Sequence, residues 1–307
     1  MIALETGFLK GSYPPLVTPF RDGAVDYETY ASLVERQIAE GSHGIVVTGT
    51  TGEPSTLTNA ERIRLVEVAA RAANRRIPVV AATGGQSHAD SIELTEAAKA
   101  AGADAVLIVT PYFIRPPQRG LIEYYVDLGR RTELPVMIYH IPGRAAVNVT
   151  VDTVAAIAER LPRLVGLKHA VNDLNFVSEL LLRLGFEFRI HVGLEDLSFP
   201  MMAVGASGMM NAAGNIVPRK VAQLYELTAA GKMAEARALH FALYELFAAI
   251  FYDTNPIPMK YMMKRLGLLP NEEHRLPMVP ATPELAKRLD AVLARAGLLP
   301  EGRAAAE

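Results

Sequence analysis

The sequence lacks cysteine altogether, and it lacks any apolar run near the roughly 18 residues that a membrane-spanning helix requires. The missing cysteines exclude disulfides, thiolate metal sites and cysteine nucleophiles, and they suit a reducing compartment. The N-terminal residues 1–7 carry an early acid and do not have the basic-then-apolar order of a signal peptide. We therefore expect a cytoplasmic protein without a membrane partner.

Strong charge of one sign is also missing. The net charge is −2 over 307 residues, and Lys and Arg are scattered rather than gathered in a basic stripe, which argues against a nucleic-acid partner. What the chain does have is a composition that is 50% hydrophobic and 21% charged, as in ordinary globular proteins. A domain of this length buries roughly three quarters of its unfolded surface, so we expect a large core.

Short apolar runs recur along the chain, and helix-like amphipathic stretches follow them, as in parallel sheets that are covered on both faces. The eight predicted strands are Tyr13–Thr18, Gly44–Thr48, Pro78–Ala82, Ala105–Thr110, Pro135–His140, Leu164–Lys168, Arg189–Gly193 and Ser207–Asn211. Predicted helices between them include Tyr27–Glu40, Asn59–Ala73, Ser87–Ala101, Ile122–Arg131 and Thr150–Arg160. The N-caps predicted for four of these helices are Asp26, Thr58, Ser87 and Thr150.

Eight such units predict a (β/α)₈ barrel. An open, doubly wound sheet would carry a Gly-rich phosphate turn after its first strand, and Thr18–Phe20 is not one. We assign residues 1–230 to the barrel and residues 231–307 to C-terminal helices packed on it, in one domain, because no Ser/Gly-rich linker separates them. The helices predicted from Arg219 onward are Arg219–Ala230, Met233–Ala249, Pro258–Leu266 and Pro283–Ala296. Active sites in this fold lie at the carboxyl ends of the strands.

Three sets of residues at strand ends carry chemistry. Lys168 ends an apolar strand; a lysine there commonly reaches solvent, but in a low-dielectric barrel mouth its neutral amine can attack a ketone and form an imine. The Gly49–Pro54 turn offers backbone N–H groups and threonine hydroxyls that suit a carboxylate, although such a sequence is often only a turn. Tyr139 ends another strand, where it could relay protons, and Arg144 could bind a second carboxylate. Together these residues suit one imine intermediate.

On these residues the chain resembles the dihydrodipicolinate synthase and N-acetylneuraminate lyase superfamily of class I aldolases over essentially its whole length. The matching segments are Leu16–Phe20, Gly49–Glu53, Val109–Tyr112, Ile138–Arg144, Gly166–Lys168, Asn255–Lys260 and Arg275–Met278. The resemblance implies that Lys168 forms the imine and that Tyr139 relays protons with Thr50. It also implies that Thr50 and Thr51 of the Gly49 turn bind the pyruvate carboxylate. Arg144 is then expected to meet the second substrate.

The resemblance further implies that the backbone carbonyl of Met210 lines the pocket and that the protein forms a homo-oligomer, a dimer of dimers. Family members carry a second tyrosine after Tyr112 whose hydroxyl reaches a neighbouring subunit's site, whereas Phe113 has no hydroxyl to give. His169 replaces the usual Glu after the imine lysine, and His140 replaces Asn after the relay tyrosine. These departures leave the imine chemistry in place and leave the second substrate open.

Other interpretations compete with this one. His140, His169 and His191 could be ligands of a metal-dependent barrel hydrolase. Glu195 and Asp196 could be an acid–base pair, but we expect them to cap a helix beginning near residue 197. A barrel that binds a small acid without catalysis is a further alternative.

Lys260 is interpreted as structural, because Pro258 marks a first helical turn. The hypothesis is thus an imine-forming lyase without a metal or other cofactor, acting on a 2-oxo acid and an aldehyde. A dihydrodipicolinate synthase-like condensation of pyruvate with aspartate semialdehyde is its first form. An aldolase or dehydratase of a 4-hydroxy-2-oxo acid or a 2-keto-3-deoxy sugar acid is its second.

Overall fold

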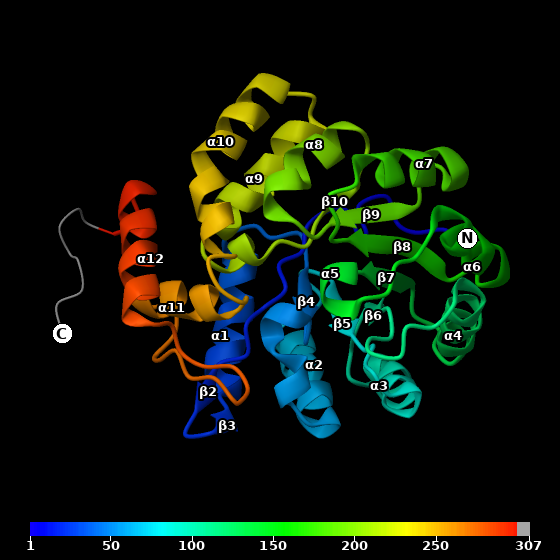
Figure 1. The fold of residues 1–307 in the computed structure, drawn as a ribbon, viewed down its shortest axis with the longest axis horizontal. Helices are drawn as coiled ribbons and strands as arrows, with labels where there is room; N and C mark the ends of the chain where they lie inside the picture. Colours follow the sequence, from blue (N-terminus) through cyan, green and yellow to red (C-terminus); the bar gives the residue numbers. More distant parts are fainter. Residues whose placement is uncertain (300–307) are drawn as a thin grey trace.

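The computed structural model describes residues 1–299, and residues 300–307 of the predicted C-terminal segment lie outside the described residues. Eight strands form one sheet in the order β1-β10-β9-β8-β7-β6-β5-β4, and every neighbouring pair is parallel. The strands are β1 (Gly11–Ser12), β4 (Ile45–Val47), β5 (Val79–Ala82), β6 (Ala105–Val109), β7 (Val136–His140), β8 (Leu164–His169), β9 (Arg189–Val192) and β10 (Gly208–Met209). A parallel bridge between Pro15 and Val46 brings the two ends of the sheet together. The predicted (β/α)₈ barrel is confirmed (Figure 1).

The first strand differs from its prediction. β1 ends at Ser12, before the predicted run Tyr13–Thr18 begins, although Leu16 N–H still donates to Val46 O at 3.0 Å. Two consecutive prolines, Pro14 and Pro15, have no N–H for a ladder, so regular pairing stops there. A short hairpin of β2 (Phe20–Arg21) and β3 (Ala24–Val25), which was not predicted, follows.

Helices surround the barrel, and the four predicted N-caps Asp26, Thr58, Ser87 and Thr150 are confirmed, since each side chain accepts a backbone N–H of its helix. The helix predicted from Ile122 begins four residues earlier, at Gln118. Its start was missed because the first three residues, 118–120, carry no apolar side chain that would extend the helical pattern. The helices through the barrel are α1 (Tyr27–Ala39), α2 (Asn59–Ala73), α3 (His88–Ala100), α4 (Gln118–Arg130), α5 (Pro142–Ala145), α6 (Val151–Arg160), α7 (Leu174–Leu184), α8 (Ser198–Ala203) and α9 (Pro218–Ala229). Short 3₁₀ helices are η1 (Thr50–Gly52), η2 (Pro54–Thr56), η3 (Glu195–Leu197) and η4 (Ala212–Asn215).

Three further helices follow the barrel: α10 (Met233–Ala249), α11 (Ile257–Arg265) and α12 (Pro283–Arg295). α10 packs on α9, while α11 contacts η4 and α12. In Figure 1, strands β8 and β9 point toward the side of the molecule that carries α11 and α12. The C-terminal helices therefore stand beside the carboxyl ends of the strands, where a barrel carries its site.

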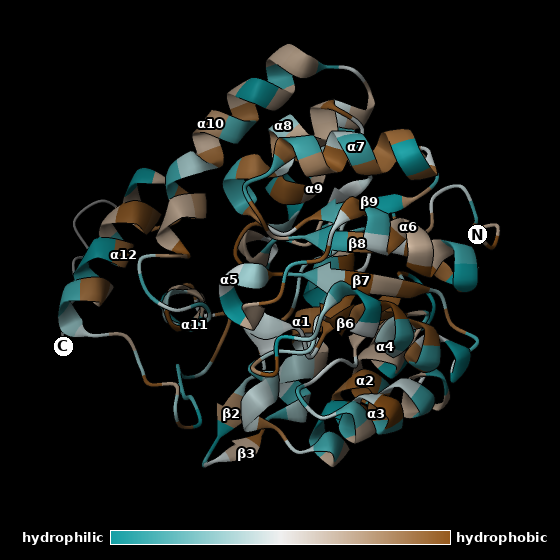
Figure 2. Cartoon of the chain, turned by 45° about the vertical axis from the view of Figure 1, so that its right-hand side comes forward, coloured by the Kyte–Doolittle hydropathy of each residue, from teal (hydrophilic) through white to brown (hydrophobic). Residues whose placement is uncertain are grey.

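Apolar side chains form two clusters. The larger fills the space between the strands and the helices, and teal and brown alternate along the outer helices, as on α7 in Figure 2. The smaller fills the barrel interior and includes Tyr139 and Met210. None of the helices within residues 1–299 combines the length and apolar character needed to cross a bilayer.

Candidate active site

Lys168 and Tyr139 lie side by side at the carboxyl end of the barrel. β7 and β8 pair in parallel with Tyr139 in register with Lys168, so both side chains point to the same face of the sheet, into the barrel. The Lys168 Nζ atom lies 4.3 Å from the centroid of the Tyr139 ring. Only 4% of Lys168 and 5% of Tyr139 is exposed, so the amine is held in a nearly dry environment against an aromatic face.

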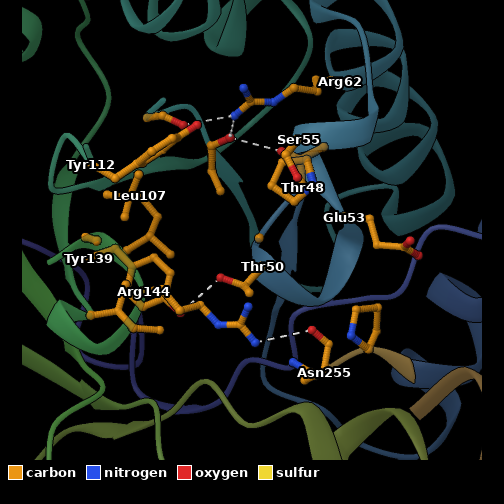
Figure 3. A pocket seen from close by; sticks show the side chains of 18 of the residues that line it. Thr48, Thr50, Glu53, Ser55, Arg62, Leu107, Tyr112, Tyr139, Arg144 and Asn255 are labelled. Carbon is orange, nitrogen blue, oxygen red and sulfur yellow. Dashed lines mark hydrogen bonds between the residues drawn. The ribbon is translucent and has the colours of Figure 1, made fainter. Parts of the chain in front are cut away.

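The turn after β4 brings a hydroxyl to Tyr139. Gly49 precedes η1, and Thr50 Oγ1 lies 3.2 Å from Tyr139 Oη, where either atom can donate (Figure 3). The turn closes on Glu53, whose backbone is left-handed with φ 55°. Three predicted residues from separate strand ends, Thr50, Tyr139 and Lys168, are thereby brought into one continuous group.

Asn255, from the segment before α11, joins the other two predicted polar residues. Its Nδ2 donates to Thr51 Oγ1 at 3.0 Å. Its carbonyl accepts from Arg144 Nη2 at 3.3 Å (Figure 3). Arg144 belongs to the short helix α5, which Pro142 opens directly after β7. One asparagine therefore links the Thr51 turn with the loop that carries the guanidinium.

A cavity of about 270 Å³ opens above this group. Among the site residues predicted from the sequence, those that line the cavity are Gly49, Thr50, Tyr112, Tyr139 and Arg144. A second guanidinium, that of Arg62, forms part of the wall and donates to the carbonyls of Ala82 and Gly84 (Figure 3). Burial lowers the pKa of Arg62 to about 10. The cavity thus carries positive charge at two places, which suits an anionic ligand.

Four predicted residues do not line this cavity. The Lys168 amine lies against the face of the Tyr139 ring, Thr51 is 2% exposed, and Met210 is buried in the barrel interior with its N–H donated to Val192 O. Phe113 is 84% exposed and has a positive φ of 74°. Access from the cavity to the Lys168 amine therefore passes the Tyr139 ring.

A glycine makes room for the amine. A Cβ atom on Gly193, which follows β9, would lie 2.8 Å from Lys168 Cε and 2.9 Å from Ala170 Cβ. Real side chains do not approach so closely, so any other residue at this position would displace Lys168. The sequence contains Gly193 at a predicted strand end, yet its closeness to Lys168 on the adjacent strand β8 is visible only in the fold.

Lys260 is a second buried lysine near the same turn. Its Nζ lies 2.5 Å from Glu53 Oε1, donates to the Glu273 carbonyl at 2.8 Å, and stands 4.3 Å from the centroid of the Phe20 ring. The other Glu53 oxygen lies 3.0 Å from His274 Nδ1. Burial lowers the pKa of Lys260, and the Glu53 charge partly offsets this. The amine faces its carboxylate, and the pair anchors the strained end of the η1 turn to the C-terminal segment.

The three strand-end histidines do not converge. His140 and His169 face outward, where both pack against Phe176 of α7, whereas His191 lies in register with Lys168 and so faces the barrel interior. Burial, followed by the charges of Arg189 and Lys168, lowers the pKa of His191 to about 3. Within residues 1–299, no group of three or more His, Asp or Glu side chains is arranged to hold a metal ion.

The expected helix cap by Glu195 and Asp196 is wrong, because neither side chain caps α8. The Glu195 carboxylate is buried and accepts the Ala212 N–H at 2.6 Å, whereas the helix that follows, α8, has no side-chain cap. Burial raises the pKa of Glu195 to about 7, against the backbone hydrogen bonds and the Lys168 charge. The sequence places acids before a helix, but the fold turns this one toward η4.

Comparisons with known proteins agree on one family. The sequence pattern of the Dihydrodipicolinate synthetase family matches residues 8–296. A 4-hydroxy-tetrahydrodipicolinate synthase from Thermus thermophilus is 45% identical over 298 residues, which cover 97% of this chain and 99% of the relative.

Solved structures give the same result. A crystal structure of dihydrodipicolinate synthase from Aquifex aeolicus superposes with a TM-score of 0.92 and 39% identity, over 94% of this chain and 98% of the other. The chloride-inhibited dihydrodipicolinate synthase from Acinetobacter baumannii complexed with pyruvate matches with a TM-score of 0.92 and 36% identity, over 95% of this chain and all of the other.

Proposed function

Because the chain belongs to the Dihydrodipicolinate synthetase family, we propose that it condenses pyruvate with aspartate semialdehyde through an imine on Lys168. The chain is a class I, dihydrodipicolinate synthase-like lyase. One observation carries the proposed mechanism: the buried Lys168 amine stands over the Tyr139 ring, whose hydroxyl is 3.2 Å from Thr50 Oγ1. A neutral amine and a hydroxyl pair at one point are what imine formation needs.

In the proposed first half-reaction, the carboxylate of pyruvate binds the Gly49–Thr51 turn. The Lys168 amine attacks the ketone, and the Tyr139–Thr50 pair carries a proton to the departing oxygen, so that water leaves and the imine forms. The protonated imine then draws electrons from the adjacent carbon, which loses a proton and becomes a nucleophilic enamine. Met210 contributes its backbone carbonyl to the pocket in this proposal.

In the second half-reaction, the enamine carbon attacks the aldehyde of the second substrate. Arg144 lines the cavity on the side opposite Arg62, and Asn255 holds its guanidinium, which supports a role in binding the carboxylate of aspartate semialdehyde. The named synthases among the relatives favour this acceptor. A 4-hydroxy-2-oxo acid or a keto-deoxy sugar acid is the alternative substrate, and a substrate panel distinguishes it from aspartate semialdehyde.

We further propose a cytoplasmic homo-oligomer, a dimer of dimers. Phe113 and Ile114 are 84% and 73% exposed beside Tyr112 at the cavity, and large apolar side chains exposed together are typical of protein interfaces. Because Phe113 lacks a hydroxyl, proton transfer in this proposal relies on Tyr139 and Thr50. A Phe113→Tyr variant is expected to raise kcat of the condensation if the missing hydroxyl limits it.

Borohydride reduction tests the proposal. With pyruvate present, reduction is expected to fix a permanent adduct on the peptide that contains Lys168, as identified by mass analysis. A panel of aldehyde acceptors and 2-oxo acids then separates the substrates. Condensation with aspartate semialdehyde supports the synthase function. Inactivity there, with rapid cleavage of a keto-deoxy acid, would replace it with the aldolase alternative.

A further inference from the structure

Two histidines directly follow Tyr139 and Lys168 in the sequence and lie on the opposite face of the sheet. His140 follows Tyr139 on β7 and His169 follows Lys168 on β8, and the two are in register. Their side chains point outward, and the Nδ1 atoms of the two rings lie 3.3 Å apart. Both residues are essentially fully buried. A direct imidazole–imidazole contact thus joins the two strands immediately behind the proposed reacting groups.

The far nitrogen of each ring contacts a different loop. His140 Nε2 lies 2.6 Å from the side-chain Oδ1 of Asn148 and accepts the Val149 N–H at 3.4 Å. His169 Nε2 lies 3.2 Å from the Asp173 carbonyl, just before α7. The ring of His169 also stacks on Phe176, with centroids 4.7 Å apart and planes 4° apart. Every ring nitrogen of the pair therefore has a partner.

For a neutral pair, counting protons fixes the arrangement. The Asp173 carbonyl can only accept, so His169 Nε2 carries a proton; the Val149 N–H can only donate, so His140 Nε2 is bare. A neutral His140 then carries its proton on Nδ1 and donates it to a bare His169 Nδ1. The side-chain amide of Asn148 donates to the bare His140 Nε2 when its NH₂ group, rather than its oxygen, faces that nitrogen. This orientation is reached by rotating the amide by 180°, which exchanges two groups of nearly equal size.

A charged pair does not fit this site. In the alternative, Asn148 keeps its oxygen toward His140 Nε2, which then carries a proton. The hydrogen bond between the two Nδ1 atoms would then need a third proton, so one ring would be a cation. The Val149 N–H would also point at the protonated Nε2. Burial of a cation without a bonded carboxylate is unfavourable. Burial lowers the pKa of His140, and burial with the neighbouring His140 lowers the pKa of His169 to about 4.

We propose that His140 and His169 form a neutral hydrogen-bonded bridge that positions the Arg144 loop against the ends of β7 and β8. The His140 ring binds residues 148 and 149, so the segment that starts at Ile141 and carries Arg144 is closed at both ends on one imidazole. His169 extends this closure to β8 and to the loop before α7. Both are positioning residues, and the proposal rests on the proposed function of Arg144.

Protonation of His169 at Nδ1 breaks the bridge, since two N–H groups would then face each other. Protonation of His140 at Nε2 instead places an N–H against the Val149 N–H. Asp173 is the acid that acts on both imidazoles, and it opposes the effect of burial. Other charged groups on the packed elements are Asp152 on α6 and Glu179 and Arg183 on α7, which line the outer groove with Asn148. On the inner side the nearest charge is that of Lys168, the chain neighbour of His169. We expect the bridge to be intact at neutral pH and lost in acid.

Nitrogen NMR of ¹⁵N-histidine-labelled wild-type protein tests the bridge itself. At pH 7.5 we expect one Nδ1 proton that is shared between two nitrogen nuclei, with a scalar coupling across the hydrogen bond. His140→Gln and His169→Gln each remove this signal and so assign it. An imidazolium at either position at pH 7.5, or the absence of coupling between the rings, would overturn the proposal. This measurement does not depend on turnover.

Kinetics test the positioning role. His169→Leu keeps a bulky side chain but loses both the acceptor for His140 and the N–H donated to the Asp173 carbonyl. We expect KM for the aldehyde to rise about tenfold, while KM for pyruvate changes little. His169→Gln restores an acceptor and should recover most of the loss. His240→Gln, at another buried histidine on α10, is the matched control and should change neither constant.

A rise of both KM values together in His169→Leu, or no difference between the Leu and Gln variants, would show that His169 acts only through packing and would overturn the positioning role. Failure of the wild-type enzyme to form a reducible pyruvate adduct would instead contradict the proposed function and leave the NMR result standing. The two failures are therefore distinguishable.

Discussion

Two buried lysines stand beside the barrel mouth in nearly matching surroundings. Lys168 and Lys260 are 4% and 1% exposed, and each Nζ lies 4.3 Å from the centre of an aromatic ring. They differ in their counter-ion. Lys260 is 2.5 Å from the Glu53 carboxylate, whereas no ion pair joins Lys168 within residues 1–299.

The difference accords with a structural role for Lys260 and with the reactive role proposed for Lys168. A carboxylate at contact distance favours the charged form of an amine, which has no lone pair for attack on a ketone. Lys168 instead has a neutral His191 as its neighbour on β9. In the proposed mechanism, burial alone therefore does not make a lysine a nucleophile; the absence of a paired carboxylate is the further condition.

Exchange of each amine for a guanidinium is the strongest test of this comparison. Lys168→Arg is expected to lower kcat by about 10⁴-fold or more and to abolish the borohydride-trapped adduct, because a guanidinium cannot form the imine. Lys260→Arg keeps the charge beside Glu53 and should keep the adduct. Mass analysis of both variants after reduction with pyruvate gives the answer, and an adduct that persists in Lys168→Arg would end the comparison.

Removal of the paired lysine should act on stability. Lys260→Met leaves the Glu53 carboxylate buried without its cation, and we expect the free energy of unfolding to fall by about 3–5 kcal/mol in urea titrations. Lys264→Met is the matched control on the same helix, because its ion pair with Glu272 at 2.8 Å is partly exposed and should contribute about 1 kcal/mol or less. Equal losses in the two variants would mean that Lys260 has no special role.

The space around Lys168 can be altered without touching its charge. Gly193→Ala places a methyl group 2.8 Å from Lys168 Cε, and we expect kcat to fall about 10- to 100-fold because the amine is displaced from the ketone. Gly143→Ala, where an added Cβ meets no atom within 4 Å, is the control at the same mouth. Circular dichroism checks that both variants fold. A Gly193→Ala enzyme with normal kcat would show that Lys168 tolerates displacement.

The smallest expected effect concerns His191, the neutral neighbour of Lys168, and is a loss of folding stability in acid. The pKa of His191 is about 3 in the folded protein and roughly 6.5 when unfolded. Its contribution to stability is complete above the unfolded pKa and declines as the pH falls toward 3, since only the unfolded chain takes up the proton. At pH 5 the loss is about 2 kcal/mol. His191→Leu should lack this loss between pH 7.5 and pH 5 in urea titrations; an equal loss would contradict the assignment.

Much of the fold was predictable because its signals are local. Strand and helix segments follow from apolar periodicity, and caps such as Thr58 follow from a hydroxyl three residues before Glu61. The error at Tyr13–Thr18 also has a local cause, the paired prolines that apolar periodicity does not weigh. The exposure of Phe113, by contrast, had no local signal, because it depends on a loop with φ 74° that stands away from the barrel.

The sequence by itself determined the alternation of elements and the end of the strand on which Lys168 lies. Only the tertiary structure decided that Glu53 meets Lys260 across more than 200 residues, that Asn255 links Thr51 to Arg144, and that His140 meets His169. The physical reason is range. Periodicity and capping act within a few turns of chain, whereas the charge state of a buried group depends on whichever atoms the fold brings within a few ångströms of it.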